Sequence, residues 1–367
     1  MMSDPWADFL SRGLLGPDIL IRNADVEIST VRVGEHIVPL VTNQKGCPHC
    51  SWVASLRNAY GPYARAETDV VPMNRFLRPL CIAASYAAEA ILTAGGLAGG
   101  NYFNNWLLAT NLYLPTPTAD EILASLDNQN LTNSNLPVVI RSLTPPLHAG
   151  LIAELSEAGF LLFPARQVWI VQNPAEGEWR KHRDSRNDLA LWETTKNQWE
   201  WIPGSSFTDH DYTQALHLYQ RLYRERYPSF NPDFTEHFLR IGQATGFLNL
   251  VGLRAASSPV LSGVIGMVHR GNTSCTPLLG YDLNQLQSIG LYRLLTLRAF
   301  LECETRRTAL HCSAGAGKFK ASRGARAHVE FTAVWANHLP LYRRANLLAL
   351  SAAVTKWLVP YMAAHEF

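Results

Sequence analysis

Three runs of β-prone residues in the second half of the chain constrain its fold more than any other feature. They are FLNLVGLRA (247–255), VLSGVIGMVHR (260–270) and SCTPLLGYD (274–282). The Gly271-Asn272 step between the last two is typical of a tight hairpin turn, so we expect three adjacent antiparallel strands. A helix that begins at Gly290 and reaches about Arg306 follows them. This order predicts an α/β domain with a mostly antiparallel sheet.

Helices and further strands surround these runs. The sequence predicts one helix over 210–226, with Asp209 as its N-cap, and a second over 233–244, with Pro232 beside its first turn. The Gly246 position is a plausible stop for the second helix. Two more strands are expected after the Gly290 helix, at 308–314 and 328–335.

The first half of the chain shows a similar alternation of apolar segments. Two strands are expected around a Gly34-Glu35 turn within 27–42, and a long helix over 76–94 ends at Gly95-Gly96. The remaining expected elements are a strand at 106–115, a helix at 119–127 capped by Thr118, a strand at 137–143, a helix from Pro145 to Ala158 and a strand-turn-strand at 160–171.

A chain of 367 residues is too long for one typical domain and suits two. The composition changes at 172–207, where NPAEGEWRKHRDSRNDLALWE is highly charged. We place the boundary there, with one domain over 1–175 and the other over 176–367. The charged run is either a linker or, from the LALWE at its end, a helix with one apolar face.

Bulk composition excludes several protein classes. The net charge is +2 and the pI is about 8.2, so no basic stripe indicates a DNA-binding protein. No apolar run reaches the ~18 residues of a membrane span, and the acidic start MMSDPWADFL is unlike a signal peptide. Six cysteines are too sparse for a disulfide framework. We therefore expect a cytoplasmic protein with reduced thiols.

The second half resembles the GNAT acyltransferase superfamily, in the branch that contains CelD-like and, further away, Fem-like proteins. The similarity covers about 180–335 and rests on the order of four features: the basic entry RKHRDSRNDL, the strand pair that ends in GYD (280–282), the helix led by Gly290, and GKFKASRGA (317–325). The resemblance implies an α/β fold of tandem GNAT-like domains, each with a mixed, mostly antiparallel sheet flanked by helices. The first half would be a second unit of this kind, catalytic or degenerate.

The resemblance also implies a site for acyl-CoA as co-substrate. The strand Thr276–Asp282 would offer backbone groups to the pantetheine amides, and the helix start would offer N–H groups and a positive dipole end to the pyrophosphate. Gly290 permits close approach of a phosphate, and Arg293 could add charge. The implied binding residues are Leu278, Leu279, Gly280, Ser288, Gly290, Leu291, Tyr292 and Arg293. Only Gly290 matches the richer glycine pattern of the family loop, so an ordinary strand-loop-helix is the competing interpretation.

Acyl transfer to an amine needs a proton acceptor and a proton donor. The candidate catalytic residues are Lys320, Tyr281, Asp282 and His311, with Tyr292, His328 and Glu330 as further options. In Fem-like relatives the lysine that corresponds to Lys320 is thought to stabilise developing negative charge. Lys318, Arg323 and Arg326 add to that positive run, for which an exposed, solvated loop is the competing interpretation. Adjacent strand residues such as Tyr281 and Asp282 face opposite sides, so only one of them can face a cleft.

CPHC (47–50) is the sharpest local motif. A C-x-x-C pair can be a redox centre or half of a zinc site, but no second ligand pair accompanies it. We expect buried or incidental thiols and no metal. The aromatic and basic segment SWVASLRNAYGPYARAE (51–67) either lines a cleft or forms a packed amphipathic helix.

These observations lead to an N-acyltransferase as the expected function. It would move an acyl group from acyl-CoA, or from a carrier-protein thioester, to the amine of a small amino-acid-like metabolite or biosynthetic intermediate. The alternatives are a Fem-like transferase that uses aminoacyl-tRNA, and a non-catalytic GNAT-like binding protein. No DNA or membrane partner is expected.

Overall fold

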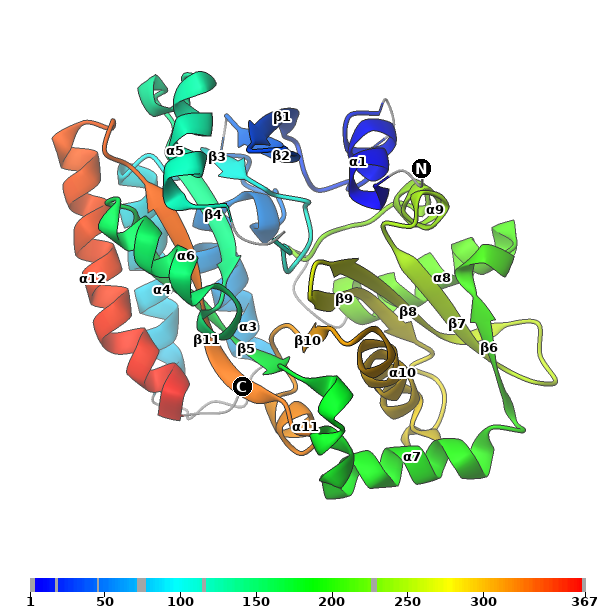
Figure 1. The fold of residues 1–367 in the computed structure, drawn as a ribbon. Helices are drawn as coiled ribbons and strands as arrows, with labels where there is room; N and C mark the ends of the chain where they lie inside the picture. The colour runs from blue at the N-terminus through cyan, green and yellow to red at the C-terminus, as the bar shows by residue number, and fades with distance from the viewer. Residues whose placement is uncertain are drawn as a thin grey trace. The chain divides into compact units, whose positions relative to one another are not determined.

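The computed structural model describes residues 4–16, 19–44, 46–70, 77–113, 117–225 and 230–364. The chain divides into two compact units, coloured along the sequence in Figure 1. Unit 1 comprises Met1–Ile21, Val168–Arg226 and Phe234–Ala327, and unit 2 comprises Arg22–Gln167, Tyr227–Asp233 and His328–Phe367.

Unit 1 contains the predicted antiparallel strands. Its helices are α1 (Pro5–Phe9), α7 (Arg183–Thr195), α8 (Asp209–Gln220), α9 (Glu236–Thr245), α10 (Leu291–Arg306) and α11 (Gly317–Ala321). Its strands are β6 (Trp199–Pro203), β7 (Asn249–Ala255), β8 (Leu261–Arg270), β9 (Thr273–Tyr281), β10 (Ala309–His311) and the end of β5 (Leu161–Val171). The strand order is β5-β10-β9-β8-β7-β6, in which only the β9–β10 pair is parallel.

The hairpin between β8 and β9 confirms the central sequence prediction. Arg270 pairs with Thr273, and Gly271 takes φ +57° in the turn between them. Helices α8 and α10 pack on opposite faces of these strands. A Cβ placed on Gly280 would lie 2.5 Å from the backbone of Leu218 in α8, whereas one on Gly263 would meet Leu295 of α10 at 3.0 Å.

Helix boundaries in unit 1 are set by side-chain caps that differ from those expected. The N-cap of α8 is Thr208, which forms a reciprocal capping box with Asp211, so the assignment to Asp209 was wrong. Helix α9 begins after Thr235, whose hydroxyl accepts from the Phe238 amide, and not beside Pro232. Gly246, at φ +74°, ends α9 as predicted.

The strands of unit 2 follow the order β1-β2-β3-β4-β11-β5. Its strands are β1 (Glu27–Val33), β2 (His36–Asn43), β3 (Gly100–Phe103), β4 (Val138–Leu143), the start of β5 and most of β11 (Arg326–Trp335). Its helices are α2 (Leu56–Asn58), α3 (Ala64–Val70), α4 (Leu77–Ala94), α5 (Ala119–Asn128), α6 (Pro145–Glu157) and α12 (Leu341–Ala364). A core of Val31, Phe103, Ile122, Ile140 and Leu155 lies between the sheet and α5 and α6.

The strand expected at 106–115 is absent from the described part of that segment. Residues 104–113 are irregular, because asparagine side chains bond to nearby backbone groups and compete with a strand ladder. Asn111 Oδ1 accepts from the Trp106 amide at 3.1 Å, and Leu107 has φ +58°. Residues 114–116 lie outside the described residues. The segment 160–171 is one continuous strand, β5, and not two.

The order of elements repeats along the chain. The series β1, β2, β3, α5, β4, α6, β5 matches β7, β8, β9, α10, β10, α11, β11, and in each series the crossover helix joins two parallel strands. The last strand of each series pairs with a strand of the other series: β5 pairs with β10, and β11 pairs with β4. Unit 2 therefore includes 328–367, unlike the expected division at 175/176. The charged segment at 172–207 forms α7 and β6 and is not a linker.

In the described ranges, none of the helices combines the length and apolar character needed to cross a membrane.

Candidate functional site

Strand β9 separates from its parallel neighbour part of the way along its length. Thr273, Ser274 and Cys275 pair with Ala309–His311 of β10, and no pair follows them in this fully described region. On the other side β9 stays paired with β8 as far as Tyr281. Residues 276–281 therefore present one backbone edge outside the β9–β10 ladder.

A bulge marks the point where the strands part. Gly266 pairs with Leu278 and Val268 pairs with Cys275, so Thr276 and Pro277 together oppose the single residue Met267. A bulge bends the strand that carries it. Pro277 has no amide hydrogen to leave unpaired at this position. The sequence therefore builds the divergence of β9 into the strand itself.

The predicted strand residues serve different purposes. Leu278 is fully buried, and Gly280 is needed because α8 packs directly on its backbone, so this glycine is explained by packing. Tyr281 faces the opposite side, where its ring lies 6.0 Å from that of Tyr292 in α10. Leu279, on the same face as Tyr281, is 7% exposed.

Helix α10 begins without a side-chain cap. Its N-cap is Gly290 at φ +77°, preceded by a 3₁₀ turn at Gln287–Ile289 in which Ser288 is exposed. This confirms the predicted helix start. The conformation favours glycine, and a Cβ would also meet Leu191 of α7 at 2.8 Å, so packing contributes to its selection. Leu291 is 5% exposed and belongs to the core.

Arg293 takes part in an internal ion pair. Its Nε donates to Oδ1 of Asp188 at 2.5 Å, and its Nη2 donates to the Asn187 carbonyl at 3.0 Å. Arg323, two residues after α11, binds the same carboxylate, through Nε to Oδ2 at 2.6 Å and Nη2 to Oδ1 at 3.1 Å. Asp188 thus holds the start of α10 and the FKASRG segment together. Sequence reasoning missed it, although it lies in the basic entry RKHRDSRNDL.

Lys320 is buried and is not part of a solvated loop. It lies in α11, is 7% exposed, and its Nζ donates to the carbonyls of Ala314 at 2.8 Å and Ser313 at 3.3 Å. Lys318 and Arg326, in contrast, are exposed. The expected uniform basic loop is therefore two different sets of cations, because the short helix turns Lys320 inward.

The other catalytic candidates do not form one cluster with Tyr281. His311 is 1% exposed and its Nδ1 accepts from the Ser313 amide at 3.1 Å. It pairs with Cys275, six positions before Tyr281, which places them about 20 Å apart along the strand. Asp282 Oδ1 accepts from the Asn284 amide at 3.0 Å and lies 3.9 Å from Arg221, so it shapes the turn after β9.

An aromatic contact missed in the sequence joins α10 to α11. The ring of Phe319 lies 4.6 Å from that of Tyr292, and the guanidinium carbon of Arg323 lies 3.4 Å from the Phe319 ring centroid. An aromatic residue inside a glycine-rich basic run was the available signal, because such a side chain needs a packing partner. Tyr281, Tyr292, Phe319 and Arg323 together are called the aromatic wall below.

The corresponding place in unit 2 is filled by the protein's own groups. All of β3 from Asn101 to Phe103 pairs with β4, so the strands do not separate. The start of α5 is closed by carboxylates: Glu121 accepts from the Thr118 amide and Glu154 from the Ala119 amide, both at 2.9 Å. The two repeats therefore differ at the features that would bind an extended anionic ligand.

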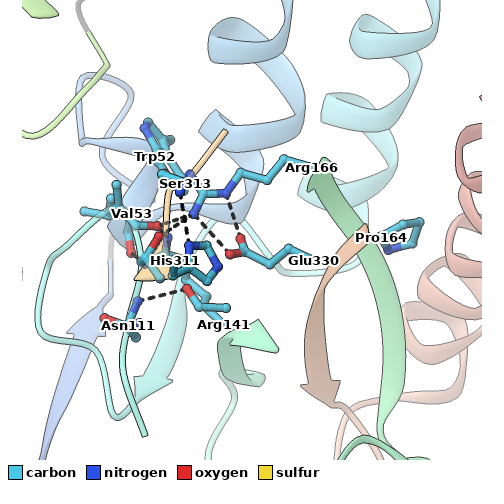
Figure 2. A network of polar contacts seen from close by, with 12 residues as sticks. Trp52, Val53, Asn111, Arg141, Pro164, Arg166, His311, Ser313 and Glu330 are labelled. Atoms are coloured by element: carbon cyan, nitrogen blue, oxygen red, sulfur yellow. Dashed lines mark hydrogen bonds and ion pairs between the residues drawn. The ribbon is translucent and has the colours of Figure 1, made fainter. Parts of the chain in front are cut away.

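Unit 2 also contains a polar network around Glu330. Figure 2 shows Arg166 against Glu330, with Nε–Oε1 at 2.8 Å and Nη2–Oε2 at 3.1 Å. Arg141 donates to four neutral oxygens, those of Val53, Asn105, Leu108 and Ala109. The Trp52 ring lies over both guanidiniums at 4.8 and 4.9 Å. Glu330 is thus committed to an ion pair, and segment 51–67 packs on the network.

The CPHC motif forms a turn in unit 2. The Cys50 amide donates to the Cys47 carbonyl at 3.2 Å, and the Asn58 side chain donates to the carbonyls of both cysteines. Burial raises the pKa of the Cys50 thiol to about 12. Over the described ranges, His, Cys, Asp and Glu side chains form no group of three or more that could hold a metal.

Comparison with known proteins supports the fold. No protein-family model matches the chain, and no curated protein matches it in sequence. Among solved structures, FemX is 9% identical over 90% of this chain and 91% of its own, with a TM-score of 0.52. L-PGS from Bacillus licheniformis is 12% identical over 64% and 77% (TM-score 0.46), and a tandem GNAT protein from the clavulanic acid biosynthesis pathway is 12% identical over 64% and 75% (TM-score 0.36). With the repeat described above, the likeness to FemX confirms the predicted tandem α/β fold, with mostly antiparallel strands flanked by helices.

Proposed function

We propose that unit 1 transfers an acyl group from a thioester to an amine. The thioester donor, acyl-CoA or a carrier-protein arm, lies along the open edge of β9, and the acceptor is a small amino-acid-like metabolite or biosynthetic intermediate. One contrast supports the proposal: the repeat in unit 1 has a strand edge and a helix start left open, whereas the repeat in unit 2 closes both.

The open edge suits the amide-containing arm of such a donor. Backbone groups of 276–281 can pair with the amides of an extended ligand as a further strand would. The uncapped start of α10 attracts negative charge through its dipole and amide groups. Together they fix a donor that has amides in its middle and phosphates at one end.

The chemistry requires no covalent enzyme intermediate. The amine nitrogen attacks the thioester carbonyl, the C–S bond breaks, the amine loses a proton and the departing sulfur gains one. Holding both reactants in line supplies much of the rate. The buried Lys320 ammonium orders the loop at Ser313–Ala314, so its proposed role is to shape the site and its electrostatic field.

The decisive experiment measures CoA and acyl-CoA binding by calorimetry, together with amide formation from a panel of amines. Ser288→Asp, which places a carboxylate beside the uncapped helix, should weaken CoA binding by about tenfold or more through repulsion. Asn197→Asp adds the same charge at an exposed position after α7 and should change binding little. Equal effects of the two substitutions, or no CoA binding by the unsubstituted protein, would refute the thioester site.

The Fem-like alternative has a different donor. The FemX likeness spans nearly the whole chain, so aminoacyl-tRNA is tested alongside acyl-CoA in the same assay. If transfer occurs with aminoacyl-RNA and not with acyl-CoA, the donor is an ester and the proposed thioester donor is wrong. If the protein binds neither donor, the result favours the alternative of a non-catalytic binding protein.

A further inference from the structure

The aromatic wall connects three elements of unit 1 at the end of β9. Tyr281 closes the strand, Tyr292 lies in the first turn of α10, and Phe319 lies in α11. Neighbouring ring centroids are 6.0 and 4.6 Å apart, with interplanar angles of 40° and 45°. The wall is a continuous run of π surfaces and not a set of isolated rings.

All three rings keep part of their surface accessible. Tyr281, Tyr292 and Phe319 are half-buried, whereas Phe300, farther along α10, is only 2% exposed. Partly open rings that meet at tilted angles leave part of their surface accessible to a planar ligand.

Arg323 gives the wall a fixed cationic end. Its guanidinium lies over Phe319, and two hydrogen bonds to Asp188 hold its plane. Asp188 also binds Arg293, and the carboxylate of Asp184 lies 3.9 Å from Arg323. The exposed Lys318, next to Phe319, adds a second cation. Aromatic faces beside cations are the combination that binds the bases and phosphates of nucleotides.

We propose that the aromatic wall stacks the adenine base of the donor. This inference rests on the proposed function, which places the donor's phosphates at the first turn of α10. Tyr292 belongs to that turn, so the adenosine joined to those phosphates lies against the wall. The acyl group lies at the other end, where β9 and β10 part near Cys275. Acyl-CoA fits this arrangement, because its pantetheine arm separates the adenine from the thioester.

Phe319→Ala tests the wall. Loss of one stacking surface should weaken binding of CoA and of adenosine 3′,5′-bisphosphate by about 5- to 100-fold. Acyl-pantetheine, which lacks the nucleotide, should keep its kcat/KM. Phe319→Trp should restore nucleotide binding. Phe207→Ala is the matched control, because Phe207 is also half-buried and pairs with Tyr212 at 5.4 Å, and it should leave all donors unaffected.

The outcomes separate this inference from the proposed function. Selective loss of CoA binding, with acyl-pantetheine unaffected, supports the wall. Weaker adenosine 3′,5′-bisphosphate binding in Phe319→Ala supports it even if no donor is turned over. Equal effects on CoA and acyl-pantetheine, or no effect on any adenine-containing probe, overturn it while leaving acyl transfer itself intact.

Discussion

Asp188 accepts a hydrogen bond from Arg323 Nε at 2.6 Å, which ties α7 to a segment 135 positions later in the chain. Both side chains are nearly inaccessible, at 3% and 7% exposed. The same carboxylate accepts from Arg293 at 2.5 Å. One buried charge therefore connects α7 to the first turn of α10 and to the segment that follows α11.

Asp188→Asn should be strongly destabilising. The substitution keeps the shape of the side chain but leaves two arginines without their anion, and breaking a buried pair costs about 3–5 kcal/mol. A lower denaturation midpoint, followed by fluorescence and circular dichroism, checks this. Asp184→Asn is the control. Asp184 is 26% exposed, and its distance of 3.9 Å from Arg323 is too long for a hydrogen bond. Equal midpoints for the two variants would contradict the assignment.

Lys320→Ala should reduce stability as well as activity. The sequence alone suggested an exposed lysine whose removal would barely change thermal stability, and its burial reverses that expectation. Losing the ammonium removes a donor from the carbonyls of Ser313 and Ala314, the first of which still accepts from the Trp169 amide, at a cost of roughly 1–3 kcal/mol. Lys318→Ala, at an exposed position, should shift the melting temperature little. Melting curves that coincide for both variants would restore the loop interpretation.

Local signals in the sequence predicted much of unit 1. The Gly271-Asn272 turn and the alternation of β8 and β9 gave the hairpin, and Gly290 gave the start of α10, because turn geometry and glycine conformation are local properties. The pairing of β5 with β10, and of β11 with β4, could not be predicted, since it joins residues more than a hundred positions apart.

The candidate site was predictable only in outline. A strand edge followed by a helix start has a sequence signature, whereas the partner of an arginine does not. Arg293 and Arg323 both looked like ligands of a phosphate, but Asp188 holds them, and only the packing of α7 reveals this. Lys320 was misplaced for a similar reason: five residues of helix at Gly317–Ala321 decide which lysine points inward.

Cys50 of the CPHC motif should behave as an unreactive thiol. Because burial raises the pKa of Cys50 to about 12, almost none of it is thiolate near neutral pH, and alkylation should be slow in the native protein. Cys47→Ser with Cys50→Ser should preserve fold and transfer activity. Elemental analysis that finds one zinc per chain, or rapid labelling of Cys50 by iodoacetamide, would contradict this.

Glu330→Gln should destabilise unit 2. Glu330 is the carboxylate that pairs with Arg166, and Arg141 close by donates only to neutral oxygens. Without it, the buried Arg141 and the half-buried Arg166 lose a compensating charge, which should cost about 3–5 kcal/mol. The exposed Glu157→Gln is the control and should cost less than about 0.5 kcal/mol. Chemical denaturation of both variants measures the difference, and a midpoint for Glu330→Gln as high as that of the control would refute it.

Protonation of His148 should weaken the fold at mildly acidic pH. Its Nδ1 accepts from the Thr144 amide at 3.0 Å, its ring packs on Tyr113, and burial lowers its pKa from 6.5 to about 4. Between pH 6.5 and 4 the unfolded chain therefore binds a proton that the folded chain does not, so stability falls as the pH falls. The full shift corresponds to roughly 3 kcal/mol.

His148→Gln should flatten that pH dependence while keeping an acceptor for Thr144. His269, whose pKa is also lowered to about 4 by burial and by Arg306, should account for part of the slope that remains. His210→Gln, at an exposed position, should leave the pH dependence of the wild type unchanged. Denaturant midpoints at pH 4.5, 5.5 and 7 measure the slopes. If His148→Gln and the wild type lose stability in parallel across this range, His148 is not the group that titrates.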